Sequence, residues 1–122
     1  MIWQWGLETA MEAKAIARYV RMSPRKVRRT LSLIKGLPLK EAQAVLDLTP
    51  QRAARVIRRV VDSAAANAEN NHGMDREELW VAQAYADAGP TLKRWRIASG
   101  GRIGSISKRI SHISVVLSDE EQ

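Results

Sequence analysis

The chain has 122 residues, enough for one domain that buries roughly two-thirds of its unfolded surface, and it lacks the cysteine that disulfides, thiol chemistry and cysteine-ligated zinc sites require. No apolar run approaches the roughly 20 residues of a membrane span, and the first residues lack the pattern of a secretory or transit peptide, so we expect a cytoplasmic protein. The formal net charge of +7 indicates a polyanionic partner, because excess Lys and Arg raise the local concentration of phosphate groups.

The first predicted elements are a strand and a helix. Residues 13–22 are predicted to form the strand, because their larger apolar side chains share one parity. These side chains are Ile16, Val20 and Met22. A helix is expected next, because Ser23 can cap it, Pro24 suits its first position and Gly36 can end it. Its predicted buried stripe consists of Val27, Leu31 and Ile34.

Two more helices are expected in the middle of the chain. Residues 38–48 form the shorter one, with Ala42, Val45 and Leu46 facing inward. Thr49 and Pro50 then resemble a second pair of cap and proline, which starts a long third helix that ends within residues 70–73. Its apolar residues recur at helical spacing, and their small size permits close packing. They are Ala53, Ile57, Val60, Ala64 and Ala68, with Ala54, Val61 and Ala65 beside them.

The last part of the chain is predicted to form a hairpin over about residues 79–117, with its tip at about residues 97–105. Residues 79–89 and 110–117 alternate as strands do, and Gly100, Gly101 and Gly104 permit the reversal between them. An arm extended from residue 79 to 96 would reach roughly 55 Å, against a radius of gyration of about 14 Å for such a domain. The hairpin must therefore protrude, and Gly89 with Pro90 is expected to bend or interrupt its first arm.

The Lys and Arg residues gather in two blocks that contain no acid. The first block comprises Arg18, Arg21, Arg25, Lys26, Arg28, Arg29 and Lys35. The second comprises Lys93, Arg94, Arg96, Arg102, Lys108 and Arg109. The third helix adds Arg52, Arg55 and Arg59 on its polar face. A solvated charged surface, or a flexible loop in the case of the hairpin, is the alternative interpretation, but two separate acid-free blocks favour a phosphate-bearing partner.

The charges at the start of the first helix oppose its stability. Arg25 and Lys26 lie in its first turn, where the helix dipole disfavours cations, and Arg25 repels Arg28 and Arg29. Each conflict costs roughly a few tenths of a kcal/mol. A phosphate held by the open backbone N–H groups and the guanidinium groups would convert this arrangement into a binding site.

Signals of catalysis are absent or weak. The chain has no HExxH, GxSxG or Walker motif. His112 is interpreted as packed or bonded to the backbone beside an apolar strand, and His72 as part of a helix end. The adjacent acids Asp75, Glu77 and Glu78 are interpreted as solvated surface instead of metal ligands. We therefore expect no enzyme, no cofactor and no metal.

Four separated strings carry a resemblance to a known family. They are AKAIARYVRMSPRKVR, ANAENNH, AYADAGPTLKR and SHISVVL, in this order. From Met11 to Ser118 the chain closely resembles the bacterial large-subunit ribosomal proteins of the uL22 family. The resemblance implies an α+β fold, with three helices packed on a small antiparallel sheet and a long protruding β-hairpin. It also implies a structural role: binding of large-subunit ribosomal RNA, support of early subunit assembly, and a hairpin along the nascent-peptide exit tunnel, where tip changes can affect macrolide sensitivity.

The resemblance can be carried over by position in the hairpin. The family's signature is matched at Lys93, Ser99, Gly101, Arg102, His112, Ile113, Val115 and Leu117. The implied tunnel tip consists of Ile97, Ala98, Ser99, Gly100, Gly101, Arg102 and Ile103. Ala98 and Gly100 stand where the family usually has an arginine-rich turn, and Ile97 stands where proline is common. Two phosphate contacts expected at the tip are therefore missing.

The expected organisation is one RNA-binding domain over residues 11–118. Residues 1–10, with Trp3 and Trp5, have no counterpart in the family pattern. They are expected to be an N-terminal extension, which either results from an upstream start, since residues 11–14 resemble the usual beginning, or is disordered or stacks on RNA. Residues 119–122 form an acidic tail.

Partners follow from the resemblance and from the charges. They are large-subunit ribosomal RNA, neighbouring ribosomal proteins and the nascent peptide near the tip, with the chain a monomer within the subunit and no membrane contact. RNA contacts are expected from Arg18, Arg21, Ser23, Arg25, Lys26, Arg28, Arg29, Arg52, Arg55, Arg59, Lys93, Arg94, Arg96, Arg102, Lys108 and Arg109.

Two other functions stay open at this point. One is an architectural DNA-binding protein that inserts a basic β-ribbon arm into the minor groove, with Ile97 or Ile103 as the wedge. The other is a protein-interaction module anchored by Trp80 and Tyr85, although such residues more often pack in a core or on a strand face.

Overall fold

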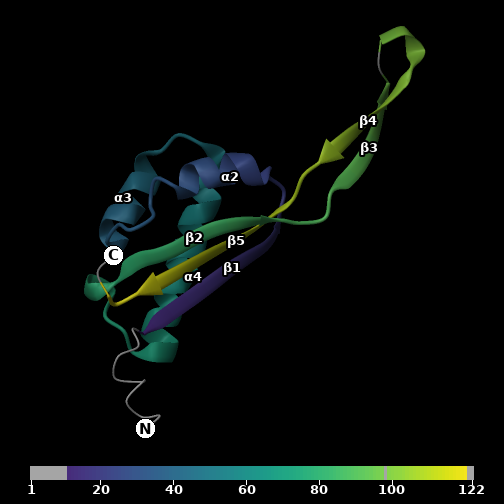
Figure 1. The fold of residues 1–122 in the computed structure, drawn as a ribbon. Coiled ribbons are helices and arrows are strands. Elements are labelled where there is room, and N and C mark those ends of the chain that lie inside the picture. Colours follow the sequence, from purple (N-terminus) through teal and green to yellow (C-terminus); the bar gives the residue numbers. More distant parts are fainter. Residues whose placement is uncertain (1–10, 98, 121–122) are drawn as a thin grey trace.

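A three-stranded antiparallel sheet in the order β1-β5-β2 forms the centre of the fold (Figure 1). The structure is a computed structural model that describes residues 11–97 and 99–120. The strands of this sheet are β1 (Glu12–Val20), β2 (Trp80–Ala88) and the central β5 (Ser111–Ser118). Val115 of β5 stands opposite both Ala15 of β1 and Ala84 of β2, so the central strand fixes the register of both its neighbours.

One face of this sheet is buried and apolar. Its buried side chains include Ile113, Val115 and Leu117 of β5 and Ala13 and Ala15 of β1. Ile16 has the opposite parity and is 41% exposed. The register shifts between Ala17 and Val20, so Val20 and Met22 pack against the core although they share the sequence parity of Ile16. Side chains at even positions are therefore exposed before the bulge and face the core after it.

Three helices contribute the rest of the core beside this face: α2 (Pro24–Leu31), α3 (Leu39–Leu48) and α4 (Arg52–His72). Helix α2 begins with its proline as expected, but the expectation that it continues to Gly36 is wrong. The backbone tightens after Leu31, because the N–H of Leu33 bonds to the Thr30 carbonyl at 3.1 Å. The predicted stripe is nevertheless confirmed, since Val27, Leu31 and Ile34 are all fully buried.

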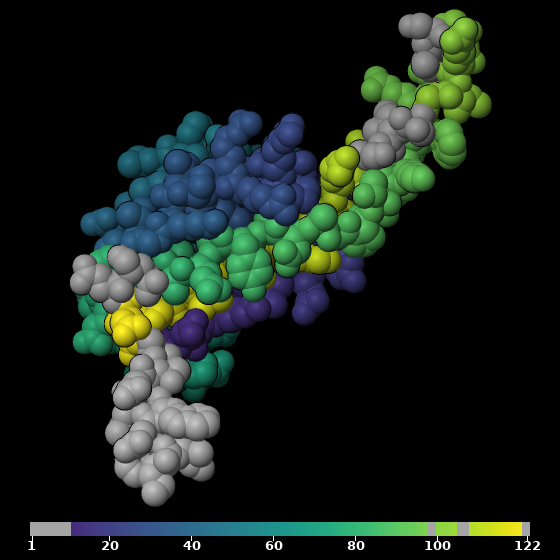
Figure 2. Space-filling view, in the orientation of Figure 1, coloured from purple at the N-terminus to yellow at the C-terminus, as the bar shows by residue number. Residues whose placement is uncertain are grey.

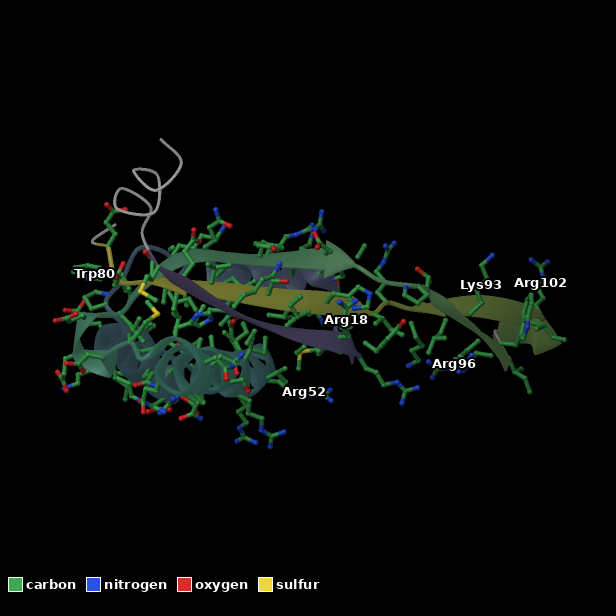
Figure 3. The ribbon with its side chains drawn as sticks, turned by 90° about the horizontal axis from the view of Figure 1, so that it is seen from below. Arg18, Arg52, Trp80, Lys93, Arg96 and Arg102 are labelled. Atoms are coloured by element: carbon green, nitrogen blue, oxygen red, sulfur yellow. The ribbon has the colours of Figure 1, made fainter. Side chains whose placement is uncertain are left out.

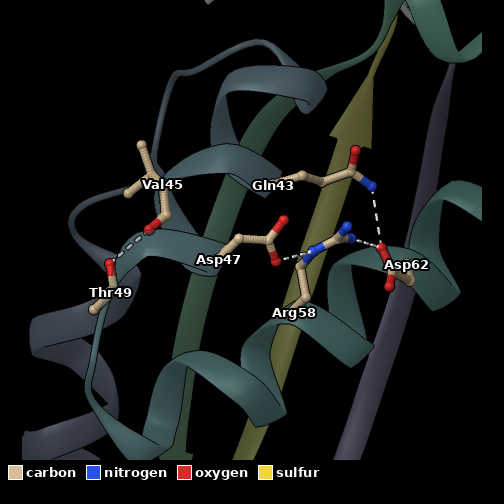
Figure 4. A network of polar contacts seen from close by, with 6 residues as sticks. All are labelled: Gln43, Val45, Asp47, Thr49, Arg58 and Asp62. Atoms are coloured by element: carbon tan, nitrogen blue, oxygen red, sulfur yellow. Dashed lines mark hydrogen bonds and ion pairs between the residues drawn. The ribbon is translucent and has the colours of Figure 1, made fainter.

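The junction of α3 and α4 differs from the prediction. Thr49 and Pro50 do not cap α4, which has Gln51 at its N-cap. Thr49 instead ends α3, because its hydroxyl donates a hydrogen bond of 2.6 Å to the Val45 carbonyl (Figure 4). A threonine hydroxyl can bond either to the following turn or back to the preceding one, and here the backward bond forms.

Helix α4 is confirmed in its length and its buried side. The predicted small and branched residues, from Ala53 to Ala68, are buried along the helix. The helix ends at Gly73, whose φ of 63° lies in the left-handed region that glycine adopts without strain. Among the described residues, no helix combines the length and the apolar character needed to cross a membrane.

A second, two-stranded sheet continues the hairpin beyond the core. It consists of β3 (Leu92–Ile97) and β4 (Ile103–Lys108). We call these two strands and the tip between them the outer hairpin. Figures 1 and 2 show the outer hairpin extending away from the sheet and the helices. The predicted α+β fold with a protruding hairpin is thereby confirmed.

The two sheets meet at Gly89 and Pro90, which interrupt the first arm as expected. The N–H of Gly89 donates to the Ile110 carbonyl at 2.8 Å. A Cβ at this position would lie 3.1 Å from Ile110 Cγ2 and 3.2 Å from His112 Nε2, so a larger residue would have to displace these two side chains, and the close approach of the two arms favours glycine.

Two short turns complete the described chain. They are the 3₁₀ segments η1 (Arg76–Glu78), before β2, and η2 (Ser99–Gly101), at the tip. Gly100 and Gly101 have φ values of 75° and 76°, which confirms that the reversal depends on glycine.

Candidate nucleic-acid interface

A hollow opens where β1 ends, α2 and α4 begin, and the outer hairpin joins the core. Its volume is about 680 Å³, and six cations line it: Arg21, Lys26, Arg29, Arg52, Lys108 and Arg109. The other lining residues are Met22, Ser23, Gln51, Ala53 and Ile110. We call this hollow the basic groove. It brings together cations from both acid-free blocks and from the start of the third helix, and none of its lining residues is acidic.

Three hydrogen bonds hold the walls of the basic groove in place. The hydroxyl of Ser111 donates to the Met22 carbonyl at 2.6 Å, which fastens the connection between β1 and α2 to the central strand. The hydroxyl of Thr30 donates to Gln51 Oε1, which joins α2 to the N-cap of α4. The Gly89–Ile110 backbone bond fixes the base of the hairpin. The cations therefore project from an ordered framework, and their relative positions do not depend on a flexible loop.

A second hollow of about 390 Å³ lies beside the first. Its lining residues are Ser23, Pro24, Arg25, Arg28, Ala88 and Arg109. Arg109 and Ser23 line both hollows, so the basic surface is continuous across the start of α2 and the base of the outer hairpin.

Ion pairs within the described chain lie elsewhere. Lys40 pairs with Glu77 at 2.6 Å, and Arg76 pairs with Glu69. Arg58 pairs with Asp47 at 3.0 Å and with Asp62 (Figure 4). Asp62 also accepts a hydrogen bond from the side-chain amide of Gln43. None of these three cations belongs to the set expected to contact RNA. Within residues 11–97 and 99–120, the expected RNA contacts form no ion pair with an acid, so an external anion can neutralise them.

Arg28 differs from the other expected contacts because it also has a structural bond. Its Nε and Nη2 donate to the Ala86 carbonyl at 3.1 and 2.8 Å, which ties α2 to β2. Arg25, one turn earlier, lines the second hollow and has no such bond to the backbone of β2.

We expect Arg28→Ala to lower the free energy of unfolding by about 1 kcal/mol, because the Ala86 carbonyl loses two charge-assisted bonds at a partly exposed site. Arg28→Lys keeps the charge but loses the planar fork, so it should be destabilised as well. Arg25→Ala is the matched control and should change stability by less than about 0.5 kcal/mol. Urea denaturation measures all three variants, and equal stabilities for the Arg28 and Arg25 variants would contradict the structural role.

Sequence comparison identifies the family. Residues 15–118 match the family described as ribosomal protein L22p/L17e. The chain belongs to this family. It is 55% identical over 112 residues to the large ribosomal subunit protein uL22 of Pelotomaculum thermopropionicum, covering 92% of this chain and 99% of that protein. Over 112 residues it is 50% identical to the protein of the same name from Halothermothrix orenii, with coverages of 92% and 99%. The corresponding protein of a Thermoanaerobacter species is 54% identical over 111 residues, with coverages of 91% and 100%.

Membership in the L22p/L17e family makes this chain a ribosomal protein and not an enzyme. Within the described residues, no group of three potential metal ligands occurs. His112 is bonded to the backbone as interpreted from the sequence, because its Nδ1 accepts from the N–H of Tyr19 at 3.1 Å. The Tyr19 ring also meets the imidazole edge-on, with ring centres 5.0 Å apart.

The remaining expected contacts lie outside the basic groove. Arg18 is exposed on β1, and Arg55 and Arg59 are exposed on α4. Figure 3 shows Arg18 and Arg52 on the body of this L22p/L17e protein, and Lys93, Arg96 and Arg102 along the outer hairpin. Arg94 donates to the Lys93 carbonyl at 3.0 Å. Of the expected tip residues, Ala98 lies outside the described residues.

Some residues of the interface could not be recognised in the sequence. Gln51 lines the basic groove and accepts a hydrogen bond from Thr30. The sequence predicted Thr49 instead of Gln51 as the N-cap of the long helix. Met22 and Ile110 form apolar parts of the lining. The sequence indicates this only in that they are adjacent to Arg21 and Arg109. Trp80 and Tyr85 are half-buried on β2, which agrees with strand-face packing.

Proposed function

We propose that this protein is a monomeric structural component of the large ribosomal subunit, in the cytoplasm, and that it binds large-subunit ribosomal RNA. The convergence of cations from three separate segments on one acid-free groove carries the proposal. Membership in a ribosomal protein family and similarity to proteins named for the large subunit support it. Residues 11–118 would act as one RNA-binding domain, which also contacts neighbouring ribosomal proteins.

The basic groove suits the phosphate backbone better than a single small anion. Its cations come from α2 and the connection that precedes it, from the start of α4 and from the base of the hairpin, and the adjoining hollow adds Arg25 and Arg28. Successive phosphates of one RNA segment could therefore contact successive cations. The first turn of α2 contains no acid, so a bound phosphate would also offset the unfavourable placement of Arg25 and Lys26.

The outer hairpin is proposed to extend along the nascent-peptide exit tunnel and to support early assembly of the subunit, with its tip near the nascent peptide. Its two strands pair only with each other, and a two-stranded ribbon is marginally stable alone in water. Phosphates around Lys93, Arg94, Arg96 and Lys108 would neutralise their mutual repulsion and hold the ribbon in place. The glycines at the tip allow the narrow reversal that a confined space requires.

Sedimentation with ribosomal subunits tests this proposal directly. The full chain is expected to remain with large subunits through a wash in high salt and to be absent from small subunits. Loss from both kinds of subunit at low salt would contradict the proposal.

Architectural DNA binding is the alternative that the sequence left open, and Ile97 and Ile103 do form an exposed apolar pair next to the tip, but membership in a ribosomal protein family favours RNA. The two candidates differ in how affinity responds to the form of the nucleic acid. Screening by salt weakens charge attraction to both, whereas contacts to RNA shape and to 2′-hydroxyl groups persist.

We therefore expect the chain to bind a folded fragment of large-subunit RNA more tightly than duplex DNA of equal charge, by roughly tenfold or more at elevated salt. Competition titrations at several salt concentrations measure the ratio. A ratio that stays near one at every salt concentration would favour the DNA-binding candidate.

A further inference from the structure

One face of the outer hairpin carries three exposed large apolar side chains. Trp95 and Ile97 share one parity on β3, and Ile103 of β4 stands directly opposite Ile97, so these three residues lie on one face. Their exposed fractions are 73%, 79% and 72%. Lys93 has the same parity, whereas Arg94 and Arg96 have the other. Figure 3 shows Lys93 and Arg96 projecting to opposite sides of the ribbon.

Nothing in the described part of the chain covers this apolar face. The outer hairpin pairs within itself and projects beyond the core, so Trp95 cannot pack on a helix or on the central sheet. An exposed cluster of large apolar side chains on an otherwise charged element indicates a binding surface. The charges around the cluster limit what can bind there.

The segment from Ala88 to Ser118 contains no acid, and its six cations are all on or beside the outer hairpin. A partner must therefore be polyanionic and must also present apolar surface to an indole ring. An unpaired nucleotide segment has both properties, because its phosphates are anionic and its bases offer flat faces for stacking. A double helix keeps its bases stacked inside, and a peptide supplies no regular series of anions.

We propose that Trp95 stacks on an unpaired base of the bound RNA, while Lys93 on the same face contacts an adjacent phosphate. Ile97 and Ile103 extend the apolar surface beside the stacked base, and Arg96 on the opposite face contacts a different part of the backbone. This inference rests on the proposed RNA-binding function and adds a specific partner, an unpaired nucleotide, to the hairpin.

The test uses the full chain and two synthetic RNAs of equal charge, one single-stranded and one a duplex. Trp95→Ala should weaken binding to the single strand by roughly 5- to 150-fold, the range expected for one stacked base. Trp95→Phe should retain binding within roughly threefold, since it keeps an aromatic face, whereas Trp95→Leu should behave like the alanine variant. Binding to the duplex should change little in all three.

Leu48→Ala is the matched control, because Leu48 is an apolar side chain on the body with 85% exposure. It should leave both affinities unchanged. Replacement of uridines in the single strand by 5-bromouridine should in addition give a photo-crosslink that mass spectrometry locates at Trp95.

Each outcome distinguishes between the proposals. Unchanged affinity of Trp95→Ala would overturn the stacking inference and leave RNA binding by the groove intact. Wild-type affinity of Trp95→Leu would overturn it as well, because an apolar contact without an aromatic ring, such as one to a peptide, would then suffice. Failure of the unchanged chain to bind either RNA would overturn the proposed function and the inference together.

Discussion

Replacing Lys26, Arg29 and Arg52 together with alanine is expected to weaken RNA binding by roughly 100-fold at physiological salt, because three charge-assisted phosphate contacts are lost at once. The slope of log affinity against log salt should flatten by roughly 2 to 3 units, at about 0.7 to 0.9 per contact. All three side chains are exposed, and the structure gives them no ion pair to lose. Thermal stability should therefore stay unchanged or rise slightly as repulsion within the groove falls.

The control removes the same charge from the body outside the groove, by replacing Lys14, Lys40 and Arg76 with alanine. Lys40 lies in the first turn of α3 and Arg76 in η1, which precedes β2, so both are far from the outer hairpin. They form surface ion pairs, which contribute about 0–1 kcal/mol each. This variant should lose some stability and retain most of its RNA affinity. If both variants lose affinity and slope equally, the net charge and not the groove determines binding.

Much of the fold follows from local patterns in the sequence. The long helix could be predicted because its alanines and branched residues recur at helical spacing, and its end because Gly73 can adopt a positive φ. The hairpin could be predicted from alternation and glycines. These signals are reliable because each depends on the chemistry of a few neighbouring residues.

The errors arose where a residue had two local choices. Thr49 could cap the next helix or end the previous one, and its bond to the Val45 carbonyl decides for the second. Helix α2 could have continued to Gly36, but the chain turns after Leu31, and the N–H of Gly36 bonds to the Val81 carbonyl of β2 at 2.9 Å. Tertiary packing decides such cases, and one sequence does not display it.

The interface shows the same division. The acid-free blocks were visible as charge runs, so the partner's charge could be predicted. That Arg52 of α4 lies beside Arg29 of α2 and Arg109 of the hairpin base depends on how the helices pack. The structural bond of Arg28 to the Ala86 carbonyl likewise joins residues far apart in the sequence. The sequence therefore identified the cations that line the basic groove, but not how the fold places them relative to one another.

The other large effect is expected at the hairpin tip. Ile97 stands opposite Ile103, so the residues between them, 98–102, can be replaced by the two-residue turn Asn-Gly without altering the register of the ladder. The replacement removes Arg102 alone among the cations. It keeps Trp95, Lys93 and the whole basic groove, so we expect the variant to enter large subunits at a level close to that of the unchanged chain.

The turn variant should assemble normally, but it should alter how ribosomes respond to drugs and peptides in the exit tunnel. A shortened tip would leave part of the proposed tunnel wall uncovered, so cells that depend on this variant should differ in sensitivity to macrolides or to stalling nascent peptides. Arg102→Ala is the control, because it removes the same charge and keeps the loop; a similar response in both variants would assign the effect to the charge. Failure of the turn variant to assemble would show that the tip itself is an anchor. Normal assembly with an unchanged response to drugs and to stalling peptides would show that the tip does not reach the tunnel wall, since a shorter tip there must alter the space available to a peptide or a drug.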